Sequence, residues 1–519
     1  MKKAIYLIIA LIGLSAPSCS DSMLDFSPTD SGSGKELLKS ASTAITSVNG
    51  VYRSMWTAGW STTANTHQCF GIAAYNLALD CMADDLIMQS QGNGWFWGDH
   101  CYNVKSNYTS SAFRSYDVWY ANYKWIANVN YIIDAEPEMA GTEADVAYVA
   151  GQAYAIRALC YLNLATWFSR APYNSLTGAS RWNEPCVPVY TTGTSIDTGG
   201  QPRESLRTVY GRIDQDIDRA IELLEKARET TLAENNKSHI NLYVALGIKS
   251  RACLAEGDWD GAFKAAKRVI DEGGYAVGTK SDLTGGMNSL DKQNVMWGAG
   301  IQVADQAGGY AGFFTHMDNK EGAYAKSAPK LISKQLYNRI SATDIRRDWW
   351  DPSDKESPYV SKKFSFANVA SFLGDYIYMR VEEMYFTAAE AALRLDDLKS
   401  ARELMNTVMA ERDPGYSANN RSGTLLGATT TTWTGSFLEN ILTHRRIELW
   451  GEYGRLFDVR RLGQGIDRRT DDGFSEECIS MMNRRNVNIT KADTYDWVLT
   501  IPKAELDANP NINDENQNP

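Results

Sequence analysis

The segment with the clearest chemical character is a loop rich in glycine and aromatic residues, QGNGWFWGDHCYN, which starts at Gln91. Trp95 and Trp97 alternate within it, so in an extended conformation both indoles would point to the same side. Flat ring faces suit the C–H groups of a pyranose, and polar neighbours could bond its hydroxyls. These neighbours are Asn93, Asp99 and Asn103. The loop is therefore a candidate binding platform, although its rings could equally anchor it to the scaffold.

A second aromatic group lies in a long irregular region between about residues 275 and 375, where Gly, Asn, Ser and aromatic residues mix. Long loops on a rigid scaffold are frequent places for binding residues. The candidates in this region are Trp297, Tyr310, Phe313 and Phe314. They are a less clearly marked candidate site than the Trp95 loop.

The sequence carries no familiar catalytic motif: HExxH, GxSxG and CxxC do not occur. The five histidines fit no familiar zinc spacing, so neither a metal nor another cofactor is predicted. Adjacent carboxylates are predicted to be ion-pair partners or solvated surface rather than the separated acids of a glycosidase. These pairs are Asp84/Asp85, Glu382/Glu383, Asp471/Asp472 and Glu476/Glu477. We therefore expect a protein without catalytic activity.

The elements that must position these loops are helices. Apolar residues recur at spacings of three and four over residues 38–55 and 206–224, and residues 145–168 form another long helical pattern. Two helical hairpins resemble each other, with breaks near Gly257 and at Asp396 and Asp397. Small residues at helix contacts and a tight polar turn are typical of tetratricopeptide-like repeats. We predict a mainly α fold, and two unrelated hairpins are the alternative reading.

The net charge limits the classes of partner, and the cysteine content limits the possible disulfides. The 519 residues carry a formal net charge of −11, which argues against nucleic acid as a partner. Seven cysteines accompany Cys19, and Cys160 and Cys253 fall in helical patterns that predict buried thiols. The plausible disulfide partners are Cys69, Cys81, Cys101 and Cys186, among which the sequence does not choose.

The N-terminus has the pattern of an export signal. Lys2 and Lys3 precede an apolar run over residues 4–14 and then small residues, so residues 1–18 are predicted to be a signal peptide. The run is shorter than the roughly 20 apolar residues that span a bilayer. Cys19 then looks like the lipidated first residue of a bacterial lipoprotein, followed by a polar tether over residues 19–34. Ordinary cleavage, with Cys19 incidental, is the alternative.

The block RRIELWGEYGRLFDVRRLG, from Arg445 to Gly463, is dense in charges of both signs. Arginine forks bind carboxylates bidentately, so this density predicts an internal ion-pair network that holds the fold. Its members are Arg445, Arg446, Arg455, Arg460, Arg461, Glu448, Glu452 and Asp458.

That block, and the closing segment IPKAELDANPNINDENQNP, are similar to the C-terminal region of SusD/RagB-family lipoproteins. YMRVEEMYFTAAEAAL and GQAYAIRALCYLNLATWF also resemble family segments, and together the matches follow the family's order over almost the whole mature chain. The resemblance implies a SusD-like fold on a tetratricopeptide-like scaffold with long ligand-binding loops. It places an N-terminal SusD-like part at residues 35–274 and a C-terminal part at residues 275–519.

The resemblance also implies a function. Family members are surface-exposed, lipid-anchored proteins of the outer membrane in Bacteroidetes-type bacteria. They act as hinged lids over a SusC-like TonB-dependent transporter and bind oligosaccharides without catalysis. The alternatives are a lid for peptides or another solute, a surface glycoside hydrolase, and a scaffold that binds only proteins.

Overall fold

The computed structural model describes residues 34–57, 66–103, 113–233, 237–303 and 311–519. Helices dominate this part of the chain and its strands are short, so the predicted mainly α fold is confirmed. The predicted signal peptide, Cys19 and nearly all of the predicted tether lie outside the described residues. None of the described helices combines the length and apolar character needed to cross a membrane.

Long helices build the N-terminal half of the chain. They are α3 (Ala41–Ser54), α4 (Ile72–Met82), α6 (Phe113–Ala135), α7 (Glu143–Phe168), α8 (Leu206–Lys226), α9 (Leu242–Glu256) and α10 (Trp259–Glu272). The main later helices are α16 (Val381–Arg394), α17 (Leu398–Ala410), α18 (Phe437–Glu448), α19 (Arg455–Leu462) and α20 (Glu476–Arg484). The shorter helices are α2 (Gly34–Leu37), α5 (Trp97–His100), α11 (Lys280–Thr284), α13 (Phe313–Met317), α14 (Ala323–Ser327), α15 (Lys334–Tyr337) and α21 (Lys503–Ala508).

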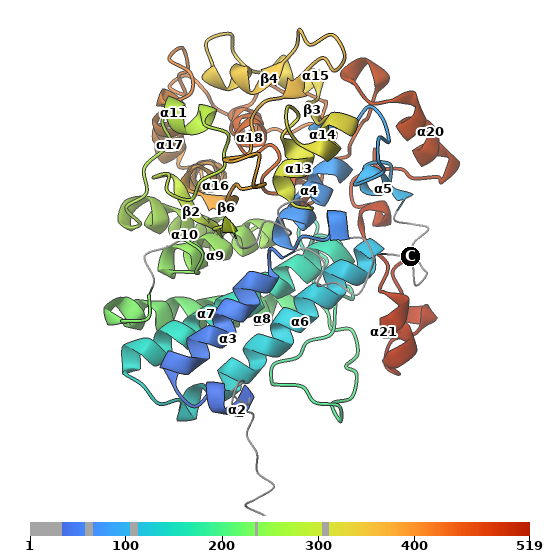
Figure 1. The fold of residues 1–519 in the computed structure, drawn as a ribbon. Coiled ribbons are helices and arrows are strands. Elements are labelled where there is room, and N and C mark those ends of the chain that lie inside the picture. The colour runs from blue at the N-terminus through green and yellow to red at the C-terminus, as the bar shows by residue number, and fades with distance from the viewer. Residues whose placement is uncertain (1–33, 58–65, 104–112, 234–236, 304–310) are drawn as a thin grey trace, which may run out of the picture.

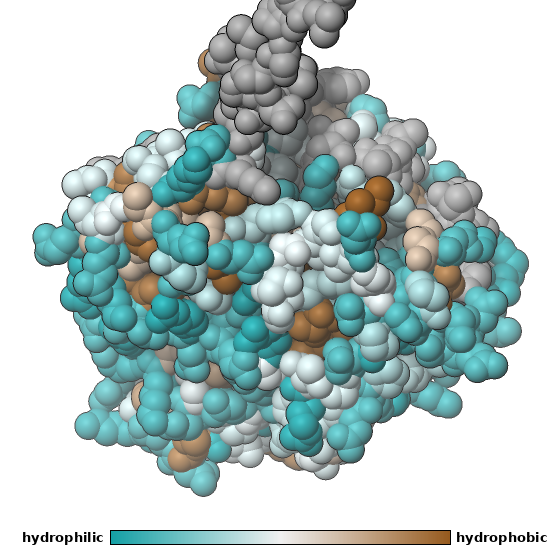
Figure 2. All heavy atoms as spheres, turned by 90° about the horizontal axis from the view of Figure 1, so that it is seen from below, coloured by the Kyte–Doolittle hydropathy of each residue, from teal (hydrophilic) through white to brown (hydrophobic). Residues whose placement is uncertain are grey.

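Helix α7 is the centre of the N-terminal half, because it packs against α3, α6 and α8. Figure 1 shows these four helices in the lower part of the molecule, with the shorter elements above them. Gly151 permits the close approach of α7 and α8, since a Cβ at this position would lie 2.9 Å from Leu224. Viewed from below, hydrophobic residues occur as small separate groups on a mostly hydrophilic surface (Figure 2).

The two predicted hairpins are present, and their turns fall where the sequence placed them. Gly257 ends α9 at a φ of 77°, and the Asp258 carboxylate caps α10 by accepting a hydrogen bond from the Gly261 amide. Asp397 caps α17 in the same way through the Ser400 amide. Helix α10 of the first hairpin packs against α16 of the second, so the hairpins are neighbours in space. The division into an N-terminal part ending at residue 274 and a C-terminal part starting at residue 275 stays a prediction.

The irregular region between α10 and α16 contributes most of the strands. A four-stranded antiparallel sheet has the order β1 (Leu86–Ile87), β3 (Leu331–Ile332), β5 (Val360–Ser361) and β4 (Trp350–Asp351). A second sheet pairs β2 (Val295–Ala299) with β6 (Tyr376–Arg380), again antiparallel. Both sheets join residues that are far apart in sequence.

The Glu448 carboxylate is the centre of a buried ion-pair network. It accepts hydrogen bonds from Arg346 at 3.0 Å, Arg380 at 3.0 Å and Arg412 at 2.8 Å. All four side chains are fully buried. Burial alone would raise the pKa of this carboxyl, but the three guanidiniums outweigh burial and hold it well below 4.5. The network therefore needs Glu448 in its ionised form.

A second set of ion pairs extends through the Arg445–Gly463 block. Asp458 accepts from Arg445 at 2.8 Å and from Arg461 at 2.7 Å. Arg446 and Arg455 reach back to Asp84 and Asp85, which follow α4. The predicted internal network is thus confirmed. Arg460 differs from the prediction, because it donates to the backbone carbonyls of Thr166 and Ser169 instead of pairing with a carboxylate.

The seven described cysteines are all buried, and none forms a disulfide. This confirms the prediction for Cys160 and Cys253. The four cysteines considered as possible bridge partners are also thiols in the structure. Core packing, rather than covalent staples, therefore holds the described part of the chain.

Replacing Glu448 with Gln should destabilise the protein by about 3–5 kcal/mol, because three buried guanidiniums would lose their shared charge partner. Urea unfolding followed by circular dichroism measures this loss. Asp260→Ala is the control, because it breaks an exposed pair with Lys264 and should change stability by less than about 0.5 kcal/mol.

The pH dependence separates a lost charge from altered packing. In the unfolded chain a glutamate takes up its proton near pH 4.3. Because the pKa of Glu448 is depressed in the fold, its stabilisation is complete above that pH and is lost as the pH falls toward the folded pKa. Glu448→Gln should lose less stability than the wild type between pH 5 and pH 3. Parallel losses in the two proteins would contradict the ionic role.

Candidate functional site

The Trp95 loop is not extended, because a helical turn begins inside it. Phe96 adopts a left-handed conformation with a φ of 60°, and α5 starts at Trp97. Trp97 is consequently buried, with 4% of its surface exposed, whereas Trp95 is half-buried. The expectation that both indoles share one exposed side is therefore wrong for Trp97, which packs in the core.

Trp95 belongs to a three-ring cluster, the Trp95 cluster, formed with His67 and Tyr324. The indole stacks on the His67 ring with centroids 4.9 Å apart and meets Tyr324 at 6.0 Å in an edge-on arrangement. Tyr324 is anchored in turn by a hydrogen bond between its hydroxyl and His67 Nδ1. The half-buried indole is thus braced by two rings that come from other parts of the sequence.

The polar residues of the loop divide into two kinds. Asn93 is exposed and its side-chain oxygen lies 3.5 Å from the Trp95 amide, while Asn103 is half-buried. Asp99 is buried and accepts two hydrogen bonds of 2.9 Å from Arg114 on α6. Asp99 therefore fastens the loop to α6, and its carboxylate is turned to Arg114 and not to the surface.

The second aromatic group lies mostly in the core. Trp297 is a residue of β2, is 1% exposed, and donates a hydrogen bond from its indole to the Ser238 carbonyl. Phe313 and Phe314 are buried in α13 and pack against Phe364, Phe366 and Tyr376. The expectation that these three rings bind ligand is not met, because strand pairing and core packing cover them. Tyr310 lies outside the described residues.

Of the four adjacent carboxylate pairs, two are bound by arginines in the core, whereas Asp472 of a third pair is buried and accepts a hydrogen bond from the Gln335 amide. Asp84 and Asp85 pair with arginines, as do Glu382 and Glu383. In the described ranges, no group of three or more His, Cys, Asp or Glu side chains is placed to hold a metal ion. The described surface instead presents aromatic side chains that could contact a ligand.

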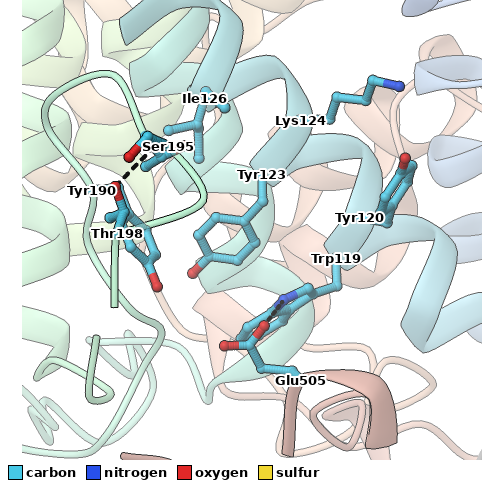
Figure 3. Close-up of a pocket in the computed structure, with 11 residues that line it drawn as sticks. Trp119, Tyr120, Tyr123, Lys124, Ile126, Tyr190, Ser195, Thr198 and Glu505 are labelled. Carbon is cyan, nitrogen blue, oxygen red and sulfur yellow. Dashed lines mark hydrogen bonds between the residues drawn. The ribbon is translucent and has the colours of Figure 1, made fainter. Parts of the chain in front are cut away.

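A cleft between α6, the loop of residues 190–198 and α21 was missed by the sequence analysis. This α6 cleft has a volume of about 530 Å³, within the range of ligand sites. Figure 3 shows Tyr123 pointing from α6 toward Tyr190, with Trp119 and Glu505 beneath it. Trp119 donates a hydrogen bond of 3.3 Å to Glu505, and the Tyr123 and Tyr190 rings meet at 5.9 Å. In the sequence, only the three-residue spacing of Tyr120 and Tyr123 on α6 pointed to this cleft.

Two family models match the chain. The model described as "SusD family" matches residues 326–519, and the model described as "Starch-binding associating with outer membrane" matches residues 43–254. The chain belongs to the SusD/RagB family. Between the two SusD/RagB matches lies the segment 255–325, which includes α10, β2 and α13. No curated protein is similar enough in sequence to match the chain.

Solved structures share the SusD-like fold. A SusD-like carbohydrate binding protein from Bacteroides vulgatus aligns with a TM-score of 0.74 and 24% identity, over 92% of this chain and 98% of the other. A SusD superfamily protein from Bacteroides thetaiotaomicron gives 0.72 and 22%, over 92% and 100%. Surface glycan-binding protein A from Bacteroides thetaiotaomicron, in complex with laminarihexaose, gives 0.63 and 16%, over 92% and 99%.

The different burial of the two indoles predicts different costs of truncation. Trp97→Ala should lower the free energy of unfolding by about 3–5 kcal/mol, because it leaves a large cavity in the core. Trp95→Ala should cost less than Trp97→Ala, because the Trp95 side chain is only half-buried and its removal leaves a smaller cavity. Chemical denaturation of both variants tests this expectation. Equal losses would show that the Trp95 ring is also a core residue.

Proposed function

We propose that this protein is a surface lipoprotein that binds oligosaccharides and passes them to a SusC-like TonB-dependent transporter in the outer membrane. In this proposal Cys19 carries the lipid and residues 19–34 form the tether. The helical body then acts as a lid whose ligand-binding surface includes the Trp95 cluster. The protein itself has no catalytic step.

Membership of the SusD/RagB family supports this role, and so do the names of the relatives. One family model is described as starch-binding and as associating with the outer membrane. Among the structural relatives, one is named a carbohydrate binding protein and another was solved with laminarihexaose. An oligosaccharide is therefore the ligand class that we propose for this chain.

The observation that carries the proposal is the braced, half-buried indole of Trp95. Stacking on His67 and contact with Tyr324 fix the ring before a ligand arrives. A fixed ring loses little side-chain freedom on binding, so more of the stacking energy contributes to affinity. Exposed Asn93 adds amide groups that can bond sugar hydroxyls next to the ring.

The state of two adjacent carboxylate pairs supports binding without hydrolysis at those residues. A glycosidase needs one carboxyl as a proton donor and a second as base or nucleophile, about 5–10 Å apart on either side of the bond. Here Asp84, Asp85, Glu382 and Glu383 are buried and paired with arginine. Their charges stabilise the fold and are turned away from solvent.

Trp95→Ala should weaken oligosaccharide binding at least tenfold, which corresponds to about 1.4 kcal/mol, because the stacking surface is lost. Isothermal titration calorimetry with laminarihexaose, maltohexaose, cellohexaose and xylohexaose measures the affinity. Trp259→Ala removes a half-buried tryptophan from α10 and should leave the affinity unchanged.

Other results would select among the alternatives. Unchanged affinity in Trp95→Ala would exclude the Trp95 cluster as the site. Binding of peptides, with none of the oligosaccharides, would indicate a peptide lid. Release of shorter sugars during incubation, followed by chromatography, would indicate a hydrolase.

The proposed anchor and partner have a separate test in cells. Cys19→Ser should move the protein from the membrane fraction to the soluble fraction, because the thioether link to lipid can no longer form. The wild-type protein, extracted in mild detergent, should copurify with a large TonB-dependent transporter. A Cys19→Ser variant that stays in the membrane fraction would argue against lipidation.

A further inference from the structure

The solvent-facing side of α6 is unusually aromatic. A surface helix normally presents polar residues to water. On α6, Phe113, Tyr116, Tyr120 and Tyr123 follow one another at spacings of three and four and are half-buried, and Tyr131, eight residues further on, is exposed. The rings of Tyr116 and Tyr120 stack with centroids 5.5 Å apart. Aromatic area of this kind on a helix surface indicates a contact surface for another molecule.

The α6 cleft opens at the middle of this aromatic row. Tyr120 and Tyr123 line it from α6, and Tyr190 lines it from the loop opposite. Its floor includes Trp119, which is 6% exposed. A concave site of about 530 Å³ with several aromatic walls fits a small ligand better than the flat surface of a protein.

The cleft is held open by hydrogen bonds behind its walls. Tyr123 donates from its hydroxyl to the Pro188 carbonyl at 2.8 Å. Asn130 on α6 donates to the carbonyls of Tyr190 and Thr192, and Arg157 on α7 donates to that of Thr191. The backbone of the loop is thus fixed to two long helices. A preformed cleft binds a ligand without the cost of ordering its walls.

The polar groups at the cleft suit an uncharged ligand that carries hydroxyls. Glu505 and Lys124 both line it, and Lys124 Nζ lies 5.5 Å from the centroid of the Tyr120 ring, away from Glu505 (Figure 3). The Glu505 carboxylate is oriented by bonds from the Trp119 indole and the Asn509 amide. The loop adds the hydroxyls of Ser195 and Thr198. Carboxylate oxygens and hydroxyls beside aromatic faces are the groups that bond and stack a sugar ring.

We propose that the α6 cleft is a second carbohydrate site, which binds a short neutral oligosaccharide segment independently of the Trp95 cluster. The proposed ligand class rests on the function proposed above, whereas the site itself uses different residues. Tyr120 and Tyr123 would stack on the sugar rings, and Glu505 would accept hydrogen bonds from their hydroxyls.

The test fills the cleft without removing a native contact. Ala127 lines the cleft, and Asn128 is the next residue of α6 but points to solvent and does not line it. Ala127→Arg should block the site, and Asn128→Arg should not. Equal melting temperatures of the two variants would establish that the fold is intact. The ligands are laminaritriose, maltotriose, cellotriose and xylotriose, which are too short to need both sites.

For a trisaccharide that binds, calorimetry should find two sites in the wild type and in Asn128→Arg. It should find one site in Ala127→Arg, with at least a tenfold loss of affinity at the other. Trp95→Ala should also retain one site. Unchanged stoichiometry in Ala127→Arg overturns the cleft proposal alone, and unchanged stoichiometry in Trp95→Ala overturns the Trp95 site alone. If no trisaccharide binds, the cleft proposal is overturned, whereas the proposed function is judged by the hexasaccharide titrations.

Hydroxyl-radical footprinting locates the second site directly. In Trp95→Ala protein, a bound trisaccharide should protect Tyr120 and Tyr123 from oxidation, and Ala127→Arg should abolish the protection. Protection by membranes that contain the transporter, with none by any sugar, would make this surface a protein interface and overturn the carbohydrate site.

Discussion

Buried charge is the constraint on which the rest of the structure depends. Glu448 ends α18, and its three arginine partners come from a short helical turn, from the end of β6 and from the residues after α17. A buried charge without a partner is costly, so all four segments must meet in one arrangement. The region between α10 and α16 has only short strands and short helices. Its path is fixed by such ionic contacts together with the core.

Much of the scaffold could be predicted because its signals are local. Helix periodicity marked the long helices, and Gly257 and Asp397 marked the hairpin turns that the structure confirms. The density of opposite charges after Arg445 predicted an internal network, although not its partners Asp84, just after α4, and Glu390 in α16. Partners of that kind lie hundreds of residues away or on another helix, so nothing in the local pattern identifies them.

The candidate sites were harder to predict, because exposure is decided by tertiary contacts. Trp95 and Trp97 look alike in sequence, yet a left-handed Phe96 and the turn that follows send one indole to the surface and the other into the core. Trp297 was buried by the pairing of β2 with β6. The α6 cleft combines α6, Tyr190 and Glu505, which no window of sequence contains together.

Helix α6 links the two surfaces mechanically. Arg114, in its first turn, donates hydrogen bonds to the Asp99 carboxylate on the Trp95 loop and to the Gln68 carbonyl. The middle of the helix forms one wall of the cleft. The helix has 23 residues and, at about 1.5 Å per residue, acts as a stiff spacer. Sites held at a fixed separation turn the second contact of a long chain into an intramolecular event. The helix would therefore act as a ruler that favours polymers over fragments through avidity.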